Sequence, residues 1–228
     1  MVKIANSNLS LSSHLFGVSG SGKTRLSLDG LCQHWGFYIS CKTRRGLASG
    51  SNDFNIATEM LQSMRIWGSE DISKNADAAD RAFAMLLRAR VSVLKQLLEQ
   101  LPADTSATAA RRRWVLAQVL PPRLDMDEDD LFVKVLRALR HADINIMLEI
   151  VRSTLRALTN QKLELFPQGS ATPLFVVIDE AQVAAVYLKD FFRSTSGTDL
   201  GPILRQMYRF FNTSRIFTGL FSRELDCR

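Results

Sequence analysis

Residues 17–24 read Gly17-Val18-Ser19-Gly20-Ser21-Gly22-Lys23-Thr24 and match the pattern G-x-x-x-x-G-K-[ST] at every fixed position. Glycine tolerates positive φ and close approach, so successive backbone N–H groups of such a loop can wrap around a polyphosphate. A helix that follows the loop points the positive end of its dipole at the same phosphates. The stretch therefore predicts a phosphate-binding loop, or P-loop.

Two side chains at the end of this loop have predicted roles. Lys23 can reach the β- and γ-phosphates of a nucleotide, and the Thr24 hydroxyl can ligate Mg²⁺. Leu15 and Phe16 lead into the loop as the end of a buried strand, and a helical pattern begins at Lys23. A Gly/Ser turn that matches by chance is the alternative, but the strand–loop–helix context favours the P-loop.

A second motif lies far downstream, where five apolar residues precede two acids in Leu174-Phe175-Val176-Val177-Ile178-Asp179-Glu180. A strand buried on both faces of a parallel sheet is continuously apolar, and its carboxyl end faces the ligand crevice. Asp179 is therefore a predicted Mg²⁺ ligand, and Glu180 is the predicted base that orients and deprotonates the attacking water. A core strand that merely ends in acids is the alternative, which the P-loop upstream disfavours.

The segment between the two motifs predicts a strand and then mainly helices. Phe37 to Cys41 reads as a buried strand, and the polar residues 42–75 are predicted to be mostly loop. Apolar residues at helical spacing predict helices over 78–101 and 109–120. The acidic residues 125–130 could suggest a metal site, but capping of a third helix explains them more simply, and Asp143 is expected to cap a fourth helix.

After the second motif we expect a helix over 183–193, a loop over 194–202 and a helix over 203–211. Residues 215–221 read as a further strand. Thr218 on that strand is the candidate sensor beside the γ-phosphate, and an ordinary strand threonine is an equally good interpretation.

The expected fold is α/β, a P-loop NTPase three-layer sandwich with a mainly parallel sheet and a large helical insertion. We expect a single domain over 1–228, with the sheet core formed by 10–42 and 172–228 and the helical insertion by 43–171.

Composition limits the class of protein. Of 228 residues, 46% are hydrophobic and 23% charged, which is ordinary for a globular protein. No apolar run approaches the roughly 18 residues of a membrane span, and residues 1–13 lack the apolar core of a signal peptide, so we expect an intracellular protein without a membrane partner. Cys32, Cys41 and Cys227 form no C-x-x-C pair, which favours reduced thiols over a zinc site.

The net charge of +6 permits a nucleic-acid partner without requiring one. Three arginines beside Trp114, at positions 111–113, could contact nucleic acid, but a helix with a solvated basic face and Trp114 in the core is the favoured interpretation. Arg209 or Arg223 could act as an arginine finger in a homo-oligomer, and an ordinary surface arginine is favoured for each.

The two motifs together resemble the additional-strand, catalytic-glutamate branch of the P-loop NTPases, which includes the AAA+ and STAND ATPases. This resemblance implies Mg²⁺-dependent ATP binding and hydrolysis coupled to a conformational change. It also implies a sensor strand between the P-loop strand and the strand that ends in Asp179. No guanine-selective signature is present, so ATP is the expected nucleotide.

Further stretches are similar to P-loop proteins of mushroom-forming fungi that are related to the ATPase part of Crinkler-type proteins. These stretches are His14-Leu15-Phe16, Asp29-Gly30-Leu31-Cys32, Trp35-Gly36-Phe37-Tyr38, and Arg113-Trp114 to Pro121-Pro122. The resemblance implies an ATPase joined to a partner module, often nuclease-like. The chain departs from that pattern because it shows no nuclease motif, no secretion or translocation header and no lid domain after 215–221. We therefore expect a fragment, a truncated gene product or a degenerate copy, in which nucleotide binding persists better than turnover.

Two alternative functions stay open. Asp179-Glu180-Ala181-Gln182 resembles a helicase box, which together with the basic charge indicates a nucleic-acid-dependent motor. The second alternative is a nucleotide-binding switch or interaction module that does not hydrolyse its nucleotide.

Overall fold

The computed structural model describes residues 3–6, 13–16, 22–42, 50–63, 72–123, 129–162, 165, 174–188, 192–193 and 200–213. Part of the predicted P-loop, residues 17–21, lies outside the described residues. So does the predicted sensor strand with Thr218.

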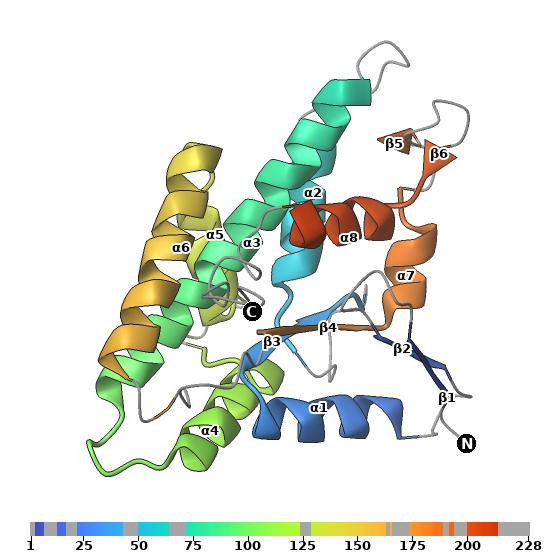
Figure 1. Cartoon of the computed structure of the whole chain (residues 1–228). Coiled ribbons are helices and arrows are strands. Elements are labelled where there is room, and N and C mark those ends of the chain that lie inside the picture. Colours follow the sequence, from blue (N-terminus) through green and yellow to red (C-terminus); the bar gives the residue numbers. More distant parts are fainter. Residues whose placement is uncertain are drawn as a thin grey trace, which may run out of the picture.

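Helices make up most of the described chain (Figure 1). They are α1 (Lys23–Gln33), α2 (Asp53–Ser63), α3 (Ile72–Gln100), α4 (Ala107–Val119), α5 (Leu131–Ala138), α6 (Ile144–Gln161), α7 (Ala181–Val186) and α8 (Ile203–Thr213). The strands are β1 (Lys3–Asn6), β2 (Ser13–Phe16), β3 (Gly36–Ser40), β4 (Phe175–Asp179), β5 (Phe192–Arg193) and β6 (Leu200–Gly201).

The described strands pair two by two. β1 pairs with β2 and β5 with β6, both antiparallel, whereas β3 and β4 form a parallel pair. A mostly helical fold with one two-stranded parallel sheet contains too little sheet to test the predicted three-layer sandwich. The α/β fold class and the domain bounds therefore stay predictions.

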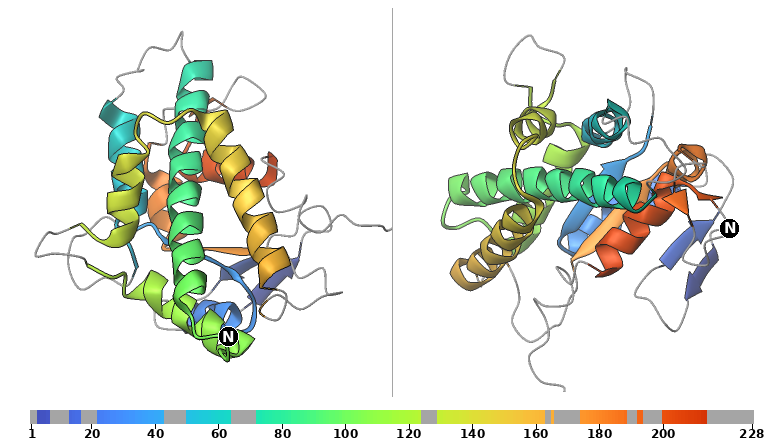
Figure 2. Two further views of the ribbon diagram at one scale, coloured as in Figure 1. Left: turned by 90° about the vertical axis from the view of Figure 1, so that its left-hand side faces the viewer. Right: turned by 90° about the horizontal axis from the view of Figure 1, so that it is seen from above.

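Helices cover both faces of the β3–β4 pair. On one face Phe37, Ile39 and Ile178 join the main apolar core, to which α2, α3, α5 and α6 contribute. On the other face Tyr38 packs with Leu31 of α1 and Val115 of α4. Figures 1 and 2 show α1 and α4 on one side of the pair and α3 with α8 on the other. This arrangement follows from strand geometry, because successive side chains point to opposite faces.

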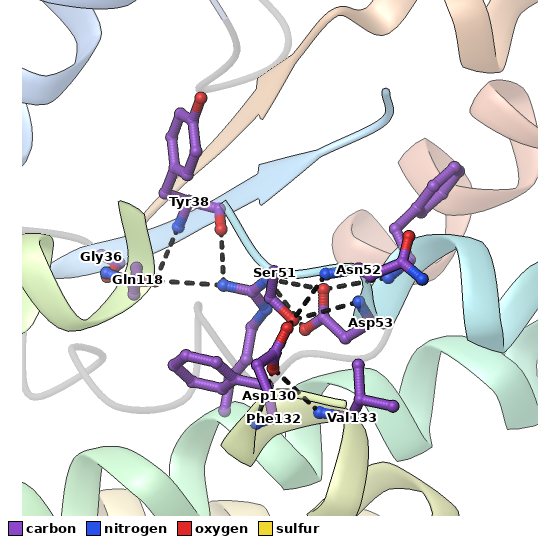
Figure 3. A network of polar contacts seen from close by, with 11 residues as sticks. Gly36, Tyr38, Ser51, Asn52, Asp53, Gln118, Asp130, Phe132 and Val133 are labelled. Carbon is purple, nitrogen blue, oxygen red and sulfur yellow. Dashed lines mark hydrogen bonds and ion pairs between the residues drawn. The ribbon is translucent and has the colours of Figure 1, made fainter. Parts of the chain in front are cut away.

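The outer edge of β3, away from β4, is covered by side chains of α3 and α4 (Figure 3). The Tyr38 N–H donates to Gln118 Oε1 at 2.8 Å, and the Tyr38 carbonyl accepts from the Arg90 guanidinium. The Gly36 carbonyl accepts from Trp114 Nε1 at 2.7 Å. Side chains of the helices thus make the hydrogen bonds that a further strand would make with these main-chain groups. β3 is therefore the edge strand of the sheet on this side.

A buried ion pair holds the helices to β3. Arg90 and Asp53 are both fully buried, and Arg90 Nη2 lies 2.8 Å from each carboxylate oxygen. The guanidinium carbon also lies 5.1 Å from the centre of the Phe132 ring. Burial raises the pKa of Asp53, and Arg90 opposes that rise. The ionised form of the buried Asp53 carboxylate is therefore stabilised by Arg90.

Asp130 extends this network between α2 and α5. Its carboxylate accepts from the main-chain N–H groups of Phe132 and Val133, and from the Ser51 hydroxyl at 2.9 Å (Figure 3). The cap on α5 is therefore also the contact that fixes the start of α2.

Several predicted elements are confirmed. α3 and α4 lie where the apolar spacing placed them, and Asp130 and Asp143 cap α5 and α6 with their carboxylates. Trp114 is 1% exposed while Arg112 lies on the exposed face of α4. The helix, its buried tryptophan and the exposure of Arg112 are thus confirmed, while nucleic-acid contact by the basic face stays an open alternative.

Other predicted elements were wrong. The described part of 42–75 is not mostly loop, because α2 lies within it and buries Phe54, Ala57 and Leu61. Strand β1 lies within residues 1–13, where no strand was predicted. The predicted helix over 183–193 ends at Val186, since Leu188 has a φ of 54° that a helix cannot continue, and Phe192–Arg193 instead pairs with Leu200–Gly201.

The burial expected of β4 also needs correction. The apolar run predicted a strand buried on both faces, but Phe175 is 40% exposed and the rest of β4 is only partly buried. Within the part of the chain that the structure describes, β4 pairs with β3 alone, so its other edge has no neighbouring strand to cover it.

Candidate functional site

The two sequence motifs meet at the carboxyl end of β4. Asp179 follows Val177 by two residues, so both side chains lie on the face of the sheet that α1 covers. Thr24 stands in the first turn of α1, and its hydroxyl oxygen lies 3.3 Å from each carboxylate oxygen of Asp179. The fold thus joins two predicted Mg²⁺ ligands that are 155 positions apart in sequence.

The start of α1 has the backbone that a phosphate site requires. Gly22 caps the helix with φ 82° and ψ 14°, a left-handed conformation that a residue with Cβ adopts only under strain. No side chain caps this end, and the first turn of α1 contains no acidic residue. The first N–H groups of a helix have no intrahelical partner, so here they can serve an anion.

Asp179 is held by Tyr38 of β3 and by Glu180, which follows β4. The Tyr38 hydroxyl donates to Asp179 Oδ2 at 2.6 Å, and the Glu180 N–H donates to Oδ1 at 3.1 Å. Burial, followed by the hydrogen bond to Asp179, raises the pKa of Tyr38 well above its usual value. The phenol therefore keeps its proton at neutral pH and acts as the donor in this bond.

The residues present fit a magnesium ion. Mg²⁺ takes oxygen ligands at about 2.0–2.1 Å in an octahedron, so adjacent ligand oxygens lie about 2.9 Å apart. The 3.3 Å between Thr24 Oγ1 and each oxygen of Asp179 is close to that spacing. The described residues contain no group of three or more His, Cys, Asp or Glu side chains placed to hold a metal ion. A site with one carboxylate, one hydroxyl and substrate phosphates needs no such group.

Glu180 has an unusual backbone at the end of β4. Its φ of 55° is left-handed, which costs a residue with a side chain about 1–2 kcal/mol, and strained residues of this kind concentrate at functional sites. Its carboxylate is one-third exposed and lies 3.9 Å from Lys42 Nζ, just beyond β3, while Gln182 Nε2 also contacts it. The predicted base thus lies beside Asp179 with its oxygens engaged.

A hollow among the described residues lies away from this site. It measures about 360 Å³, lies between α1 and α4, and is lined by Asp29, Cys32, Gln33, Thr108, Arg111 and Arg112. It is open to solvent, and its lining mixes charges of both signs without a focused set of partners. The contact between Thr24 and Asp179 is the stronger indication of chemistry, because it joins two independent motifs.

The structure describes only some of the other predicted site residues. Lys23 is partly exposed in the first turn of α1. Gly17, Val18, Ser19, Gly20 and Ser21 lie outside the described residues, as do Thr218 and Arg223. Arg209 is a partly buried residue of α8 whose Nη2 lies 2.8 Å from both oxygens of Asp80, so it belongs to an internal ion pair between α8 and α3.

Sequence reasoning missed Tyr38 and Lys42 as neighbours of the site. Strand alternation could have found Tyr38, since it separates Tyr38 from Phe37 and Ile39 and puts it on the face of α1. Lys42 carried no signal, because an isolated lysine after a strand is common.

No family model, curated protein or solved structure matches the chain with statistical significance. The resemblance to P-loop NTPases therefore depends on the sequence motifs. Over the described residues, no helix combines the length and apolar character needed to cross a membrane.

Proposed function

We propose that the chain is a Mg²⁺-dependent P-loop ATPase. The observation that supports this proposal is the contact of Thr24 with Asp179, because two motifs with separate matches to a nucleotide site come together in space. The helix start at Gly22, with left-handed φ and no side-chain cap, supports it independently.

In this proposal each residue has a defined task. The N–H groups of residues 17–24 and the Lys23 ammonium hold the phosphates. Thr24 and Asp179 would hold Mg²⁺, which would supply neutralisation of phosphate charge. Glu180 orients a water and accepts its proton as the water oxygen attacks the γ-phosphorus and the bond to the ADP oxygen breaks. Positioning and electrostatics carry such a reaction, so losing any of these groups is costly.

A second candidate is a nucleotide-binding switch without turnover. One observation favours it, since the Glu180 carboxylate already faces Lys42 and Gln182 instead of standing free for a water. Turnover requires that these contacts open when the nucleotide binds. Nucleic-acid-stimulated motor activity, a homo-oligomer or a partner module, and an intracellular location stay predictions.

The proposal is tested by isothermal titration of Mg-ATP into the wild type and Lys23→Ala. We expect the wild type to bind and the variant to lose binding, because the variant removes the cation that reaches the β- and γ-phosphates. Lys95→Ala is the matched control, since Lys95 is an exposed lysine of α3 paired with Glu99. Equal affinity in the wild type and Lys23→Ala would exclude the P-loop assignment.

A further inference from the structure

Tyr38 is the closest polar neighbour of Asp179 among the contacts that the structure gives. Its hydroxyl lies 2.6 Å from Asp179 Oδ2, whereas Thr24 Oγ1 lies 3.3 Å from that oxygen. Only 1% of Tyr38 is exposed. The hydrogen bond is charge-assisted and partly buried, and a charge-assisted bond is stronger than a neutral one.

The position of the Tyr38 side chain is fixed by groups outside the site. Its N–H donates to Gln118 of α4 and its carbonyl accepts from Arg90 of α3 (Figure 3). The ring packs in the cluster that contains Leu31 and Val115. With both main-chain groups bonded and the ring buried, the hydroxyl has little freedom to leave Asp179 Oδ2.

This bond limits what Asp179 can offer to a cation. Oδ2 accepts the short 2.6 Å bond from Tyr38, whereas Oδ1 accepts the longer 3.1 Å bond from the Glu180 N–H, so Oδ1 is the more available ligand oxygen of the carboxylate. Mg²⁺ accepts single carboxylate oxygens in a strict octahedron, whereas Ca²⁺ is larger, takes six to eight oxygens and readily uses both oxygens of one carboxylate. A carboxylate held at one oxygen therefore disfavours the larger ion.

We propose that Tyr38 is a specificity-determining residue that makes the Thr24–Asp179 site prefer Mg²⁺ to Ca²⁺. It acts through Asp179 as a positioning residue, and the inference rests on the proposed nucleotide site. Tyr38→Phe frees Asp179 Oδ2 while it keeps the ring and its packing.

The test measures Mn²⁺ binding by electron paramagnetic resonance in the presence of a non-hydrolysable ATP analogue, with Mg²⁺ and Ca²⁺ as competitors. In Tyr38→Phe we expect Ca²⁺ to compete roughly 10-fold better relative to Mg²⁺ than in the wild type, the size expected of one hydrogen bond to a charged group. Analogue affinity in EDTA should stay unchanged. Tyr208→Phe, the same change on α8, is the matched control and should leave the ratio as in the wild type.

The outcomes separate the two levels of the proposal. An unchanged Ca²⁺/Mg²⁺ ratio, with analogue-dependent Mn²⁺ binding intact, would overturn the role of Tyr38 alone. Loss of analogue affinity in EDTA would also overturn it, because Tyr38 would then support the fold of the whole site. Absence of analogue-dependent Mn²⁺ binding in the wild type would overturn the proposed function and this inference together.

Discussion

β3 and β4 lie side by side in register, yet their surroundings differ. Every residue of β3 is buried, and its outer edge is bonded to α3 and α4. No residue of β4 is fully buried, and its carboxyl end holds Asp179, which Glu180 follows. The comparison shows that burial is concentrated on β3, whereas β4 is partly exposed and ends at the two acids of the proposed site.

The contacts of Tyr38 connect the two strands. Through its main chain it belongs to the buried network of Arg90 and Gln118, and through its hydroxyl it reaches Asp179. Substitutions on the two strands should therefore have opposite signatures. Changes at β3 and its network should affect unfolding, whereas changes at the end of β4 should affect catalysis.

The largest effect is expected for Glu180→Gln. If Glu180 is the base, the variant should lose about 10²- to 10⁴-fold in Mg-ATP turnover, because an amide cannot accept the proton of the water. Its free energy of unfolding should stay within about 0.5 kcal/mol of the wild type, since the side chain is partly exposed. Phosphate release and urea unfolding measure the two quantities. Equal turnover in the two proteins would show that Glu180 is not the base.

Arg90→Met should have the opposite signature, with a loss of about 3–5 kcal/mol in the free energy of unfolding. Methionine keeps much of the apolar volume but leaves the Asp53 carboxylate buried without its partner. Urea unfolding measures the loss. Arg152→Met is the matched control, because Arg152 pairs with Glu149 at the surface, where such pairs contribute about 1 kcal/mol or less. A similar loss of unfolding free energy in both variants would show that the buried Arg90–Asp53 pair contributes no more to stability than a surface pair.

The smallest expected effect is a difference in the free energy of unfolding between two alanine variants. The substituted residues, Ile39 on β3 and Ile178 on β4, lie opposite each other. Ile39 is 1% exposed, so Ile39→Ala should lower the free energy of unfolding by about 2–5 kcal/mol. Ile178 is only partly buried, so Ile178→Ala should cost roughly half as much. Thermal and urea unfolding of the two variants give this comparison. Equal losses would mean that the two strands are equally part of the core.

The sequence was most informative where a pattern depends on local chemistry. The spacing of apolar residues located α3 and α4, and aspartates at the right distance from apolar runs located the caps of α5 and α6. The motif residues Thr24 and Asp179 could be selected because their types and spacing are specific. The structure adds that they are in contact.

The rest depended on long-range packing. Arg90 falls within the apolar stripe of α3, a position where a charge must find a partner, but the partner Asp53 lies on a helix that the polar composition of 42–75 concealed. Tyr38 lies within a run that reads as an ordinary buried strand, and its contact with Asp179 spans 141 positions. Such pairs are set by which elements meet, which a local pattern does not encode.

The parallel pairing of β3 and β4 has a consequence for synthesis on the ribosome. With 141 positions between Tyr38 and Asp179, and elongation at about 5–20 residues per second, β4 emerges on the order of 10 s after β3. During that interval α3 and α4 can already cover the outer edge of β3, while its inner edge waits without a strand. An open edge favours association with other chains, so the nascent protein is most prone to aggregation just before Thr24 and Asp179 can meet at the proposed site.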